Sequence, residues 1–320
     1  MRAADAARGS VGYLHEAGFY GSDDEFCALI VPFVEDGLAA GEPVIIGYDE
    51  RKAGLLRSWL PDPSAVNFLG DKSLYASPAG AIASYSKLFD GYLSEGAGRI
   101  RVAGDVPNPG NGSRFEGWDR YEAALNTVWD DLPVWALCLY DTATAPAGVL
   151  RVVEQTHPQI RLPGGSRRGG RGYRDPSEFR GLPVPPDPLE RSAPAVEIVF
   201  GSAAEARHAV EQAGRGHVAE EVLQDFLIGA SEAVSNALLY GQPPVTVRIW
   251  SGPGRLVVSV HDQGPGPADR LAGLVPASQR GTGVGMGLGL WVMHQLDLDV
   301  ALCYGDDGFT VRLSGGEAVP

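Results

Sequence analysis

Lysine is scarce in this chain of 320 residues, which contains only Lys52, Lys72 and Lys87. None of the three follows a glycine, and the pattern GxxxxGK[ST] does not occur. That pattern supplies the lysine with which P-loop proteins hold the phosphates of a nucleotide. We therefore expect no working P-loop, so a nucleotide site in this chain would have to be built from other residues.

Cysteine is equally rare, with Cys27, Cys138 and Cys303 and no pair at CxxC spacing. An odd number of cysteines without paired spacing argues against a disulfide framework. Each lies in an apolar segment, so we expect buried, reduced thiols of the kind found in a reducing compartment. No group of cysteine and histidine has the spacing of zinc ligands, and zinc is not expected.

Long hydrophobic runs are also missing. The chain contains no stretch of 18 apolar residues, the length that a membrane helix needs. Residues 1–8 (MRAADAAR) lack the hydrophobic core of a signal peptide. The formal net charge is −14, and an acidic surface repels nucleic-acid phosphates but can bind a basic protein. The sequence predicts a soluble, cytoplasmic protein that contacts neither membrane nor nucleic acid directly.

The length and a hydrophobic content of 44% indicate two globular domains, each large enough for its own core. In the N-terminal part, expected strands alternate with expected helices, the first of which is capped by Ser22 and stops at Gly41. This alternation predicts an α/β domain with a largely parallel sheet. The expected strands are 43–48, 66–69, 99–103 and 134–140, and further helices are expected near 51–60, 78–95 and 115–130.

The segment 161–194 differs in composition from the rest of the chain. A glycine-rich stretch, GGSRRGGRG at 164–172, precedes a proline-rich one, PVPPDP at 183–188, and the segment carries seven arginines. Glycine makes a chain flexible and proline stiffens it, so this composition is typical of a linker between domains. Two interpretations stay open. The segment is either a solvated linker or an arm whose arginines dock on an acidic surface of this protein or of a partner.

Glu232 and Asn236 form the first of three motifs in the last third of the chain. They stand four residues apart in an apolar stretch that predicts a helix, and residues at this spacing share one helix face. The carboxylate can accept a proton, and the amide oxygen can bind Mg²⁺.

The second and third motifs are rich in glycine. Asp262 ends a stretch with strand character and is followed by Gly264 and Gly266, which let a flat base approach the backbone. The carboxylate of Asp262 can accept a hydrogen bond from an exocyclic amine. The run GTGVGMGLG at 281–289 then leads into an apolar helix expected at 288–296. Bare N–H groups at a helix start are suited to bind phosphate.

In this order and spacing, the motifs resemble the GHKL ATPase superfamily and its Bergerat ATP-binding fold, an α/β sandwich, over residues 195–316. Glu232 and Asn236 match its N box, and Thr310 occupies a position where the family often has a threonine near adenine. The sequence around Ser231 and the short gap between the glycine motifs are most similar to RsbW-type anti-sigma-factor serine kinases. The other matching residues are Asp262, Gly264 and Gly266 of the G1 box and Gly285, Gly287 and Gly289 of the G2 box.

The resemblance implies a site for ATP and Mg²⁺. Asp262 would recognise the adenine amino group, Asn236 would hold Mg²⁺, and Glu232 would orient or deprotonate an incoming serine or threonine hydroxyl. It also implies two protein partners: a sigma factor that is sequestered, and an anti-anti-sigma protein of the STAS type that is phosphorylated. RsbW-like domains commonly dimerise, so a homodimer is implied as well.

Residues 11–160 resemble the MEDS domain, a DcmR-like sensory module with a RecA-like α/β fold. The resemblance rests on HEAGFYGSDDEF at 15–26, GEPVII at 41–46, YEAALN at 121–126 and CLYD at 138–141. In the last motif the family commonly has proline where this chain has leucine. A MEDS-like domain before an RsbW-like domain is the arrangement of RsbA-type anti-sigma-factor regulatory proteins.

The first domain offers a candidate sensory site. Ligands of parallel α/β sheets bind beyond the carboxyl ends of the strands. Asp49, Asp105 and Asp141 each follow an expected strand, so we expect them to face one crevice, which would sense a small ligand, or pH through a histidine. The alternative is that the histidine is an ordinary core or surface residue and the carboxylates only cap strand ends. The residues expected to join the crevice are His15, Tyr20, Glu122 and Asn126.

Two other functions stay open. The chain could be a binding module that holds ATP and sequesters a sigma factor without phosphoryl transfer. It could also be a sensor histidine kinase, which needs a dimerising helical hairpin with an exposed histidine before the ATP domain. His208 and His217 lie on an expected helix at 203–227, but a single helix leaves no room for such a hairpin.

Overall fold

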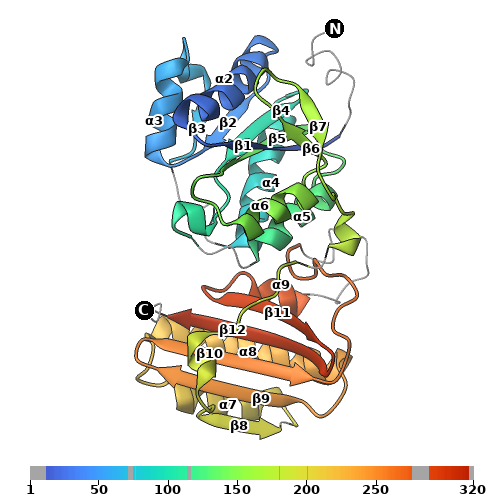
Figure 1. Ribbon diagram of the computed structural model, residues 1–320. Coiled ribbons are helices and arrows are strands. Elements are labelled where there is room, and N and C mark those ends of the chain that lie inside the picture. The colour runs from blue at the N-terminus through green and yellow to red at the C-terminus, as the bar shows by residue number, and fades with distance from the viewer. Residues whose placement is uncertain are drawn as a thin grey trace. The chain divides into compact units, whose positions relative to one another are not determined.

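The computed structural model describes residues 12–70, 75, 77–113, 117–179, 181–199, 201–275 and 288–316. Its contacts divide the chain into two compact units, Met1–Gly181 and Leu182–Pro320. Both units combine a sheet with helices, as Figure 1 shows. The expected two-domain α/β organisation is confirmed.

The N-terminal unit is built on a seven-stranded sheet with the strand order β3-β2-β4-β5-β1-β6-β7. Every neighbouring pair is parallel except the antiparallel pair β6–β7, so the expected parallel character is confirmed. The strands are β1 (Leu14–Tyr20), β2 (Val44–Gly47), β3 (Asn67–Phe68), β4 (Ile100–Gly104), β5 (Val134–Asp141), β6 (Gln159–Arg161) and β7 (Arg167–Gly169).

Helices lie on both sides of this sheet (Figure 1). Trp135, Leu137 and Leu139 of β5 pack in one core with α2 and α3, and the alternate residues of that strand are buried as well. A strand covered on both faces is apolar along its whole length, which is why β5 reads VWALCLY. The helices are α2 (Asp23–Ala39), α3 (Glu50–Trp59), α4 (Pro78–Ser94), α5 (Trp118–Val128) and α6 (Ala147–Thr156).

The strand β1 was not predicted, although it lies between β5 and β6 inside the sheet. Its polar residues His15 and Glu16 are both buried, 3% and 2% exposed, so the strand shows no alternation of polar and apolar residues. Glu16 forms ion pairs with Arg161, at 3.3 Å, and with Arg167. Tertiary contacts, rather than local pattern, make this segment a central strand.

The segment expected to be one linker is divided between the two units. Its first part contributes β7, and Arg168 pairs there with Glu154. In its second part Asp187 pairs with Arg255 at 2.6 Å, and Glu190 pairs with Arg312 at 3.0 Å. In the first part an arginine of the segment thus pairs with a carboxylate of the chain itself, whereas in the second part carboxylates of the segment pair with arginines of the C-terminal unit.

The C-terminal unit is built on an antiparallel sheet with the order β11-β12-β10-β9-β8. Three helices pack on one face of this sheet, and the core lies between them. The strands are β8 (Val196–Val199), β9 (Thr246–Gly252), β10 (Arg255–Asp262), β11 (Asp299–Gly305) and β12 (Gly308–Gly316), and the helices are α7 (Ala203–Gly214), α8 (Glu220–Tyr240) and α9 (Leu288–Met293).

The single helix expected at 203–227 is wrong, because α7 ends at Gly214 and α8 begins at Glu220. Between them Gly216 has a φ of +81°, a conformation that ends a helix and that glycine adopts without strain. Both helices contribute buried residues to the core of the C-terminal unit, among them Val210 and Phe226. They are therefore part of this domain and not a separate hairpin.

The buried ion pair between Asp187 and Arg255 makes a testable contribution to stability. The two side chains are 4% and 2% exposed, so Asp187→Ala leaves the guanidinium buried without this partner and should lower the free energy of unfolding by about 3–5 kcal/mol. Urea unfolding measures this. Glu197→Gln, which removes an exposed pair with Arg248 on the same sheet, is the control and should cost under about 1 kcal/mol.

The same pair predicts a pH dependence. Burial alone would raise the pKa of Asp187, but its hydrogen bonds with Arg255 and the N–H of Leu189, together with the charges of Arg255 and Arg312, outweigh burial and lower the pKa below the ordinary value. A carboxyl with a lowered pKa in the folded state stabilises the fold above its unfolded pKa of about 3.9. This contribution is lost as the pH falls through the folded pKa. Asp187→Ala should therefore flatten the acid limb of the curve of stability against pH.

Candidate nucleotide site and candidate sensory site

Glu232 and Asn236 both lie on α8, which runs through both positions as expected. The helix buries Phe226, Ala230 and Ala233 against the sheet. The first residues of α9 come close to the polar pair. A Cβ added at Gly289 would lie 2.6 Å from Glu232 Oε2 and 2.8 Å from Asn236 Nδ2. The two side chains therefore converge on the backbone at the start of α9, which only a glycine can provide.

Asp262 is the last residue of β10 and is only 4% exposed. Its Oδ1 accepts hydrogen bonds from the backbone N–H groups of Gln242, at 3.0 Å, and Gly264, at 2.7 Å. These bonds fix the carboxylate, and in the part of the chain that the structure describes no hydrogen bond is recorded to Oδ2. The second oxygen is thus available to a ligand.

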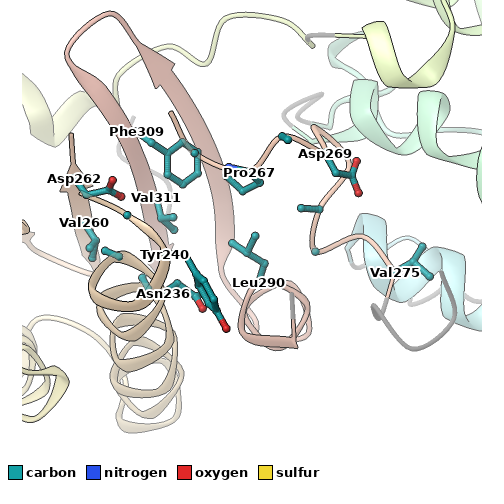
Figure 2. A pocket seen from close by; sticks show the side chains of 17 residues that line it. Asn236, Tyr240, Val260, Asp262, Pro267, Asp269, Val275, Leu290, Phe309 and Val311 are labelled. Carbon is teal, nitrogen blue, oxygen red and sulfur yellow. The ribbon is translucent and has the colours of Figure 1, made fainter. Parts of the chain in front are cut away.

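A pocket of about 430 Å³ opens beside these residues, within the size range of small-molecule sites. Figure 2 shows Asn236 and Asp262 at this pocket, between α8 and the strands. Most of its lining is apolar, which suits a flat base. Residues that the sequence did not single out provide this lining: Ala233, Ala237, Tyr240, Gly241, Val260, Pro267, Ala268, Asp269, Ala272, Gly273, Val275, Leu290, Phe309 and Val311.

The expectation that Thr310 lies near the base is not met. Side chains alternate along a strand, and in β12 it is Phe309 and Val311 that line the pocket. Thr310 points to the other face, where its hydroxyl lies 3.0 Å from Nδ1 of His261. Phe309 packs against Gly266, whose φ is +70° and whose missing Cβ would lie 2.4 Å from the ring. Gly266 is therefore required at this position.

Of the other residues expected at the site, Gly264 and Glu232 are described by the structure, and Gly285 and Gly287 are not. Gly264 binds the carboxylate of Asp262 through its N–H. Glu232 contacts α9 but is not among the residues that line the pocket. Gly285 and Gly287 lie outside the described residues, so the part of the glycine run that would reach the phosphates is not described.

The residues present fit ATP and Mg²⁺. The Nδ2 atom of Asn236 is buried and has no hydrogen-bond partner among the described residues, and a buried donor of this kind suits an acceptor such as a phosphate oxygen. The amide oxygen of Asn236 is of the kind that binds Mg²⁺. Asp262 offers an acceptor deep in an apolar pocket, suited to an exocyclic amino group.

Gly289→Ala tests the contact between the two helices. The new methyl group would collide with Glu232 and Asn236, and overpacking of this kind typically costs about 1–3 kcal/mol. We expect ATP affinity to fall about tenfold or more, as measured by calorimetry. Gly54→Ala in α3 is the control, because nothing lies within 4 Å of the added Cβ. Unchanged affinity in Gly289→Ala would mean that α9 moves freely relative to Glu232 and Asn236.

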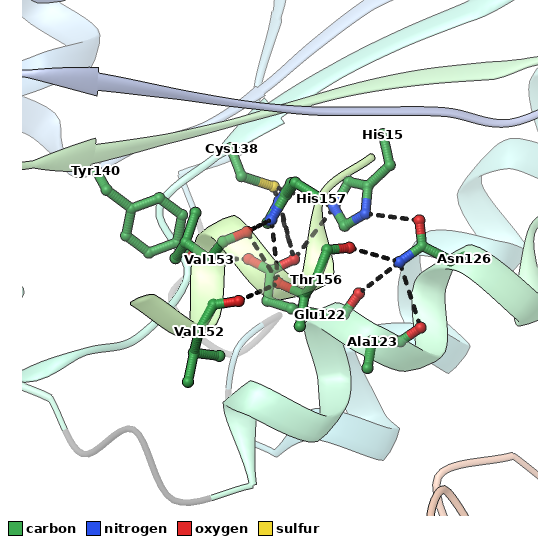
Figure 3. A network of polar contacts seen from close by, with 10 residues as sticks. All are labelled: His15, Glu122, Ala123, Asn126, Cys138, Tyr140, Val152, Val153, Thr156 and His157. Atoms are coloured by element: carbon green, nitrogen blue, oxygen red, sulfur yellow. Dashed lines mark hydrogen bonds and ion pairs between the residues drawn. The ribbon is translucent and has the colours of Figure 1, made fainter. Parts of the chain in front are cut away.

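In the N-terminal unit, His15 and Glu122 meet in a fully buried cluster (Figure 3). His15 Nε2 lies 3.2 Å from Glu122 Oε2, and Asn126 Oδ1 lies 3.1 Å from Nδ1 of the same ring. Cys138 and His157 complete the cluster, with Cys138 Sγ 3.7 Å from His15 Nε2 and His157 Nε2 3.5 Å from Glu122 Oε2. The sequence did not assign Cys138 or His157 to a site.

Burial sets the protonation states in this cluster. Burial and the neighbouring His15 lower the pKa of His157 to about 3, so this ring is neutral at pH 7. Burial, reinforced by Glu122, raises the pKa of Cys138 well above its ordinary value. Burial and Glu122 have the same effect on the pKa of Tyr140, whose hydroxyl donates a hydrogen bond to Glu122 Oε1.

The expectation of a single crevice is wrong, because the remaining residues lie in a second group at the carboxyl ends of the strands. Lys52, which the sequence analysis did not assign to this site, pairs there with Asp105 at 2.6 Å. Its Nζ lies 5.8 Å from the ring of Tyr20. Asp49 caps α3 through the N–H of Lys52, and Asp141 caps the turn that follows β5. For Asp49 and Asp141 the alternative of strand-end caps therefore describes the contacts.

The fold and the sites define the class of the protein. An α/β domain with a buried polar cluster precedes a domain in which a helical carboxylate–amide pair and a strand-end aspartate frame a pocket suited to nucleotide. Comparison with protein families agrees. Residues 14–158 match the family described as MEDS, methanogen/methylotroph DcmR sensory domain. Residues 200–314 match the histidine kinase-like ATPase domain.

The chain is thus a MEDS domain followed by a histidine kinase-like ATPase domain, the two-domain architecture of RsbA-like regulators. These domains make it a regulatory protein with an ATP-binding domain. No curated protein matched the chain. Among the described residues, no helix has the length and apolar character needed to cross a membrane.

Proposed function

We propose that this protein is an anti-sigma-factor regulator. Its ATPase domain binds ATP and transfers the terminal phosphoryl group to a serine or threonine of an anti-anti-sigma partner of the STAS type. It also sequesters a sigma factor, and the MEDS domain controls the balance between these states. The observation that carries the proposal is the convergence of Glu232 and Asn236 on the start of α9, beside the pocket that holds Asp262.

Nucleotide binding rests on Asp262 and the apolar pocket. Backbone N–H groups hold one carboxylate oxygen of Asp262 in place, so the other is oriented before the ligand arrives and little ordering is needed on binding. The oxygen accepts a hydrogen bond from the adenine amino group. Phe309, Val260 and Leu290 exclude water from the base.

Phosphoryl transfer rests on the two polar residues of α8. Glu232 orients the incoming hydroxyl of the partner and accepts its proton, the role of a positioned general base. The amide oxygen of Asn236 is the protein ligand for Mg²⁺. When bound, this ion neutralises phosphate charge during in-line transfer. Glu232 lies outside the lining of the pocket, where it can meet a hydroxyl that comes from a second protein.

The charge of the chain supports a basic partner. A net charge of −14 favours association with a protein that presents a basic surface, as sigma factors often do. Such association weakens as ionic strength rises. The proposal of a sigma factor as one partner rests on this charge and on the resemblance to RsbW-type domains.

A non-catalytic role is the second candidate, and it is compatible with the position of Glu232 outside the lining of the pocket. A carboxylate outside the pocket could act only in holding α9, while ATP serves as a structural ligand. A sensor histidine kinase has less support, because α7, which carries His208, contributes buried residues to the core of the ATPase domain.

Incubation with γ-labelled ATP, Mg²⁺ and a purified STAS-type partner separates the two candidates. The proposal expects label on a serine or threonine of the partner, detected by mass spectrometry after proteolysis. ATP binding without any labelled partner would leave the non-catalytic role. Label on His208 or His217 of this chain would instead favour a histidine kinase.

A further inference from the structure

Four side chains from four different elements direct one metal-ligating atom each toward a common point in the MEDS domain (Figure 3). They are His15 of β1, Glu122 of α5, Cys138 of β5 and His157 at the end of α6. Their ligating atoms all lie within 4.8 Å of one another. Each of the four residues is at most 7% exposed, so solvent does not explain the arrangement.

The tautomer of His157 is fixed by its surroundings. Its Nδ1 lies 2.9 Å from the carbonyl oxygen of Val153. A carbonyl can only accept, so Nδ1 carries the hydrogen. The other ring nitrogen, Nε2, faces the cluster and lies 3.5 Å from Glu122 Oε2. This atom makes no hydrogen bond with any described residue.

His15 is oriented in the same way through Asn126. The amide nitrogen of Asn126 donates to the carbonyl oxygen of Thr156 at 2.8 Å, and those of Glu122 and Ala123 lie at 3.3 and 3.4 Å. The amide oxygen therefore faces His15, and Nδ1 of His15 donates to it at 3.1 Å. The other nitrogen, Nε2, points at Glu122 and Cys138.

Four ligating atoms that face one another in a buried site repel unless a proton or a cation lies between them. We propose that the MEDS domain binds one Zn²⁺ ion through His15 Nε2, Glu122 Oε2, Cys138 Sγ and His157 Nε2. Binding displaces the proton of the Cys138 thiol, which leaves to solvent as the S–Zn bond forms. One Zn²⁺, one thiolate and one carboxylate sum to zero charge, which suits a site without solvent.

The distances fit tetrahedral zinc. Zinc bonds of about 2.0–2.3 Å to nitrogen, oxygen and sulfur put neighbouring ligand atoms about 3.3–3.6 Å apart in a tetrahedron. Four of the six separations are 3.2 Å for His15–Glu122, 3.5 Å for His157–Glu122, 3.7 Å for Cys138–His15 and 3.9 Å for Cys138–Glu122, and all six are at most 4.8 Å, so small side-chain shifts complete the tetrahedron. A mixed set of imidazole, thiolate and carboxylate also suits zinc better than Mg²⁺ or Ca²⁺.

An outer layer of hydrogen bonds supports the four ligands, as is usual around metal sites. Val153 and Asn126 accept from the far nitrogens of the two histidines. The hydroxyl of Tyr140 donates to the second carboxylate oxygen of Glu122. With four protein ligands the site has no open position, so it resembles structural sites more than catalytic ones. The ion would tie two central strands to two helices and couple metal supply to the folding of the sensory domain.

Zinc could not be expected from the sequence, because the ligands stand at positions 15, 122, 138 and 157 and show no local spacing.

Metal content and Co²⁺ spectra of the full chain test the proposal. The purified protein should contain one zinc per chain. After removal of zinc by a chelator, Co²⁺ should produce the visible absorption of a tetrahedral centre together with a thiolate-to-cobalt charge-transfer band. Zinc should also raise the melting temperature of the metal-free chain.

Cys138→Ser and Cys27→Ser form a matched pair of variants, because both cysteines are buried in the same domain. The Cys138 variant should lose the charge-transfer band and bind zinc at least about tenfold more weakly, whereas the Cys27 variant should behave as the wild type. If Cys138→Ser fails to fold, the cobalt spectrum of the wild-type protein still tests the site by itself. Absence of the cobalt bands, together with a melting temperature that zinc does not change, would overturn the proposal. Protons shared between Glu122 and the two histidines would then account for the cluster.

Discussion

Asp262→Asn is expected to weaken ATP binding by about 100-fold. The substitution keeps the size of the side chain, and the amide oxygen can still accept from the N–H groups of Gln242 and Gly264. The amide nitrogen then faces the adenine amino group, so two donors meet in a buried pocket. Unsatisfied buried polar groups cost about 1–3 kcal/mol each, and two of them account for the factor. Calorimetry with Mg²⁺ and ATP measures the change.

Inosine triphosphate provides the control, because it carries an oxygen where adenine carries the amino group. Wild type should bind it much more weakly than ATP, whereas the amide nitrogen of Asp262→Asn can donate to that oxygen. The preference for ATP should therefore shrink or reverse in the variant, with no change in melting temperature. A variant that binds ATP as wild type does would show that Asp262 does not contact the base.

The polar residues of the nucleotide site could be predicted because their relations are local. Glu232 and Asn236 share a helix face wherever that helix forms, and Asp262 ends a short run rich in valine, which favours a strand. Their convergence on Gly289 is tertiary. No local pattern in the sequence predicts it.

Strand register and apolar lining were harder to predict. Shifting a strand by one residue moves every side chain to the other face, so choosing Thr310 instead of Phe309 was enough to select a residue that faces away from the pocket. Val260 and Val311 are ordinary strand residues in the sequence. Only the way β10 and β12 pair, with Val260 opposite Val311, brings them together at the pocket.

In the N-terminal domain, local sequence patterns predict even less of the candidate site. Its strand β1 contains buried charges, which local patterns assign to the surface. Once His15 and Glu16 are placed inside the sheet, their partners must come from distant elements, and His157 and Arg161 supply them. No reading of spacing along the chain brings residues 15 and 157 together, because their proximity follows from the pairing of β1 with β6.

Glu232→Gln is expected to reduce phosphoryl transfer by about 100- to 10,000-fold, the range of a lost general base. ATP affinity should stay within about threefold of wild type, because Glu232 lies outside the lining of the pocket. Glutamine keeps the size of the side chain against Gly289, so the start of α9 should not move. Single-turnover transfer to the partner, measured at saturating ATP, separates the chemical step from binding.

Glu221→Gln is the matched control, since Glu221 lies on the same helix but is exposed. It removes the same charge and should transfer normally, so a loss confined to Glu232→Gln reflects position and not charge. Normal transfer in Glu232→Gln would exclude the general base. Loss of transfer together with ATP affinity would instead mean that the carboxylate serves nucleotide binding. Because affinity and transfer are measured on the same variant, a role of Glu232 in holding nucleotide is distinguished from a role in activating the hydroxyl.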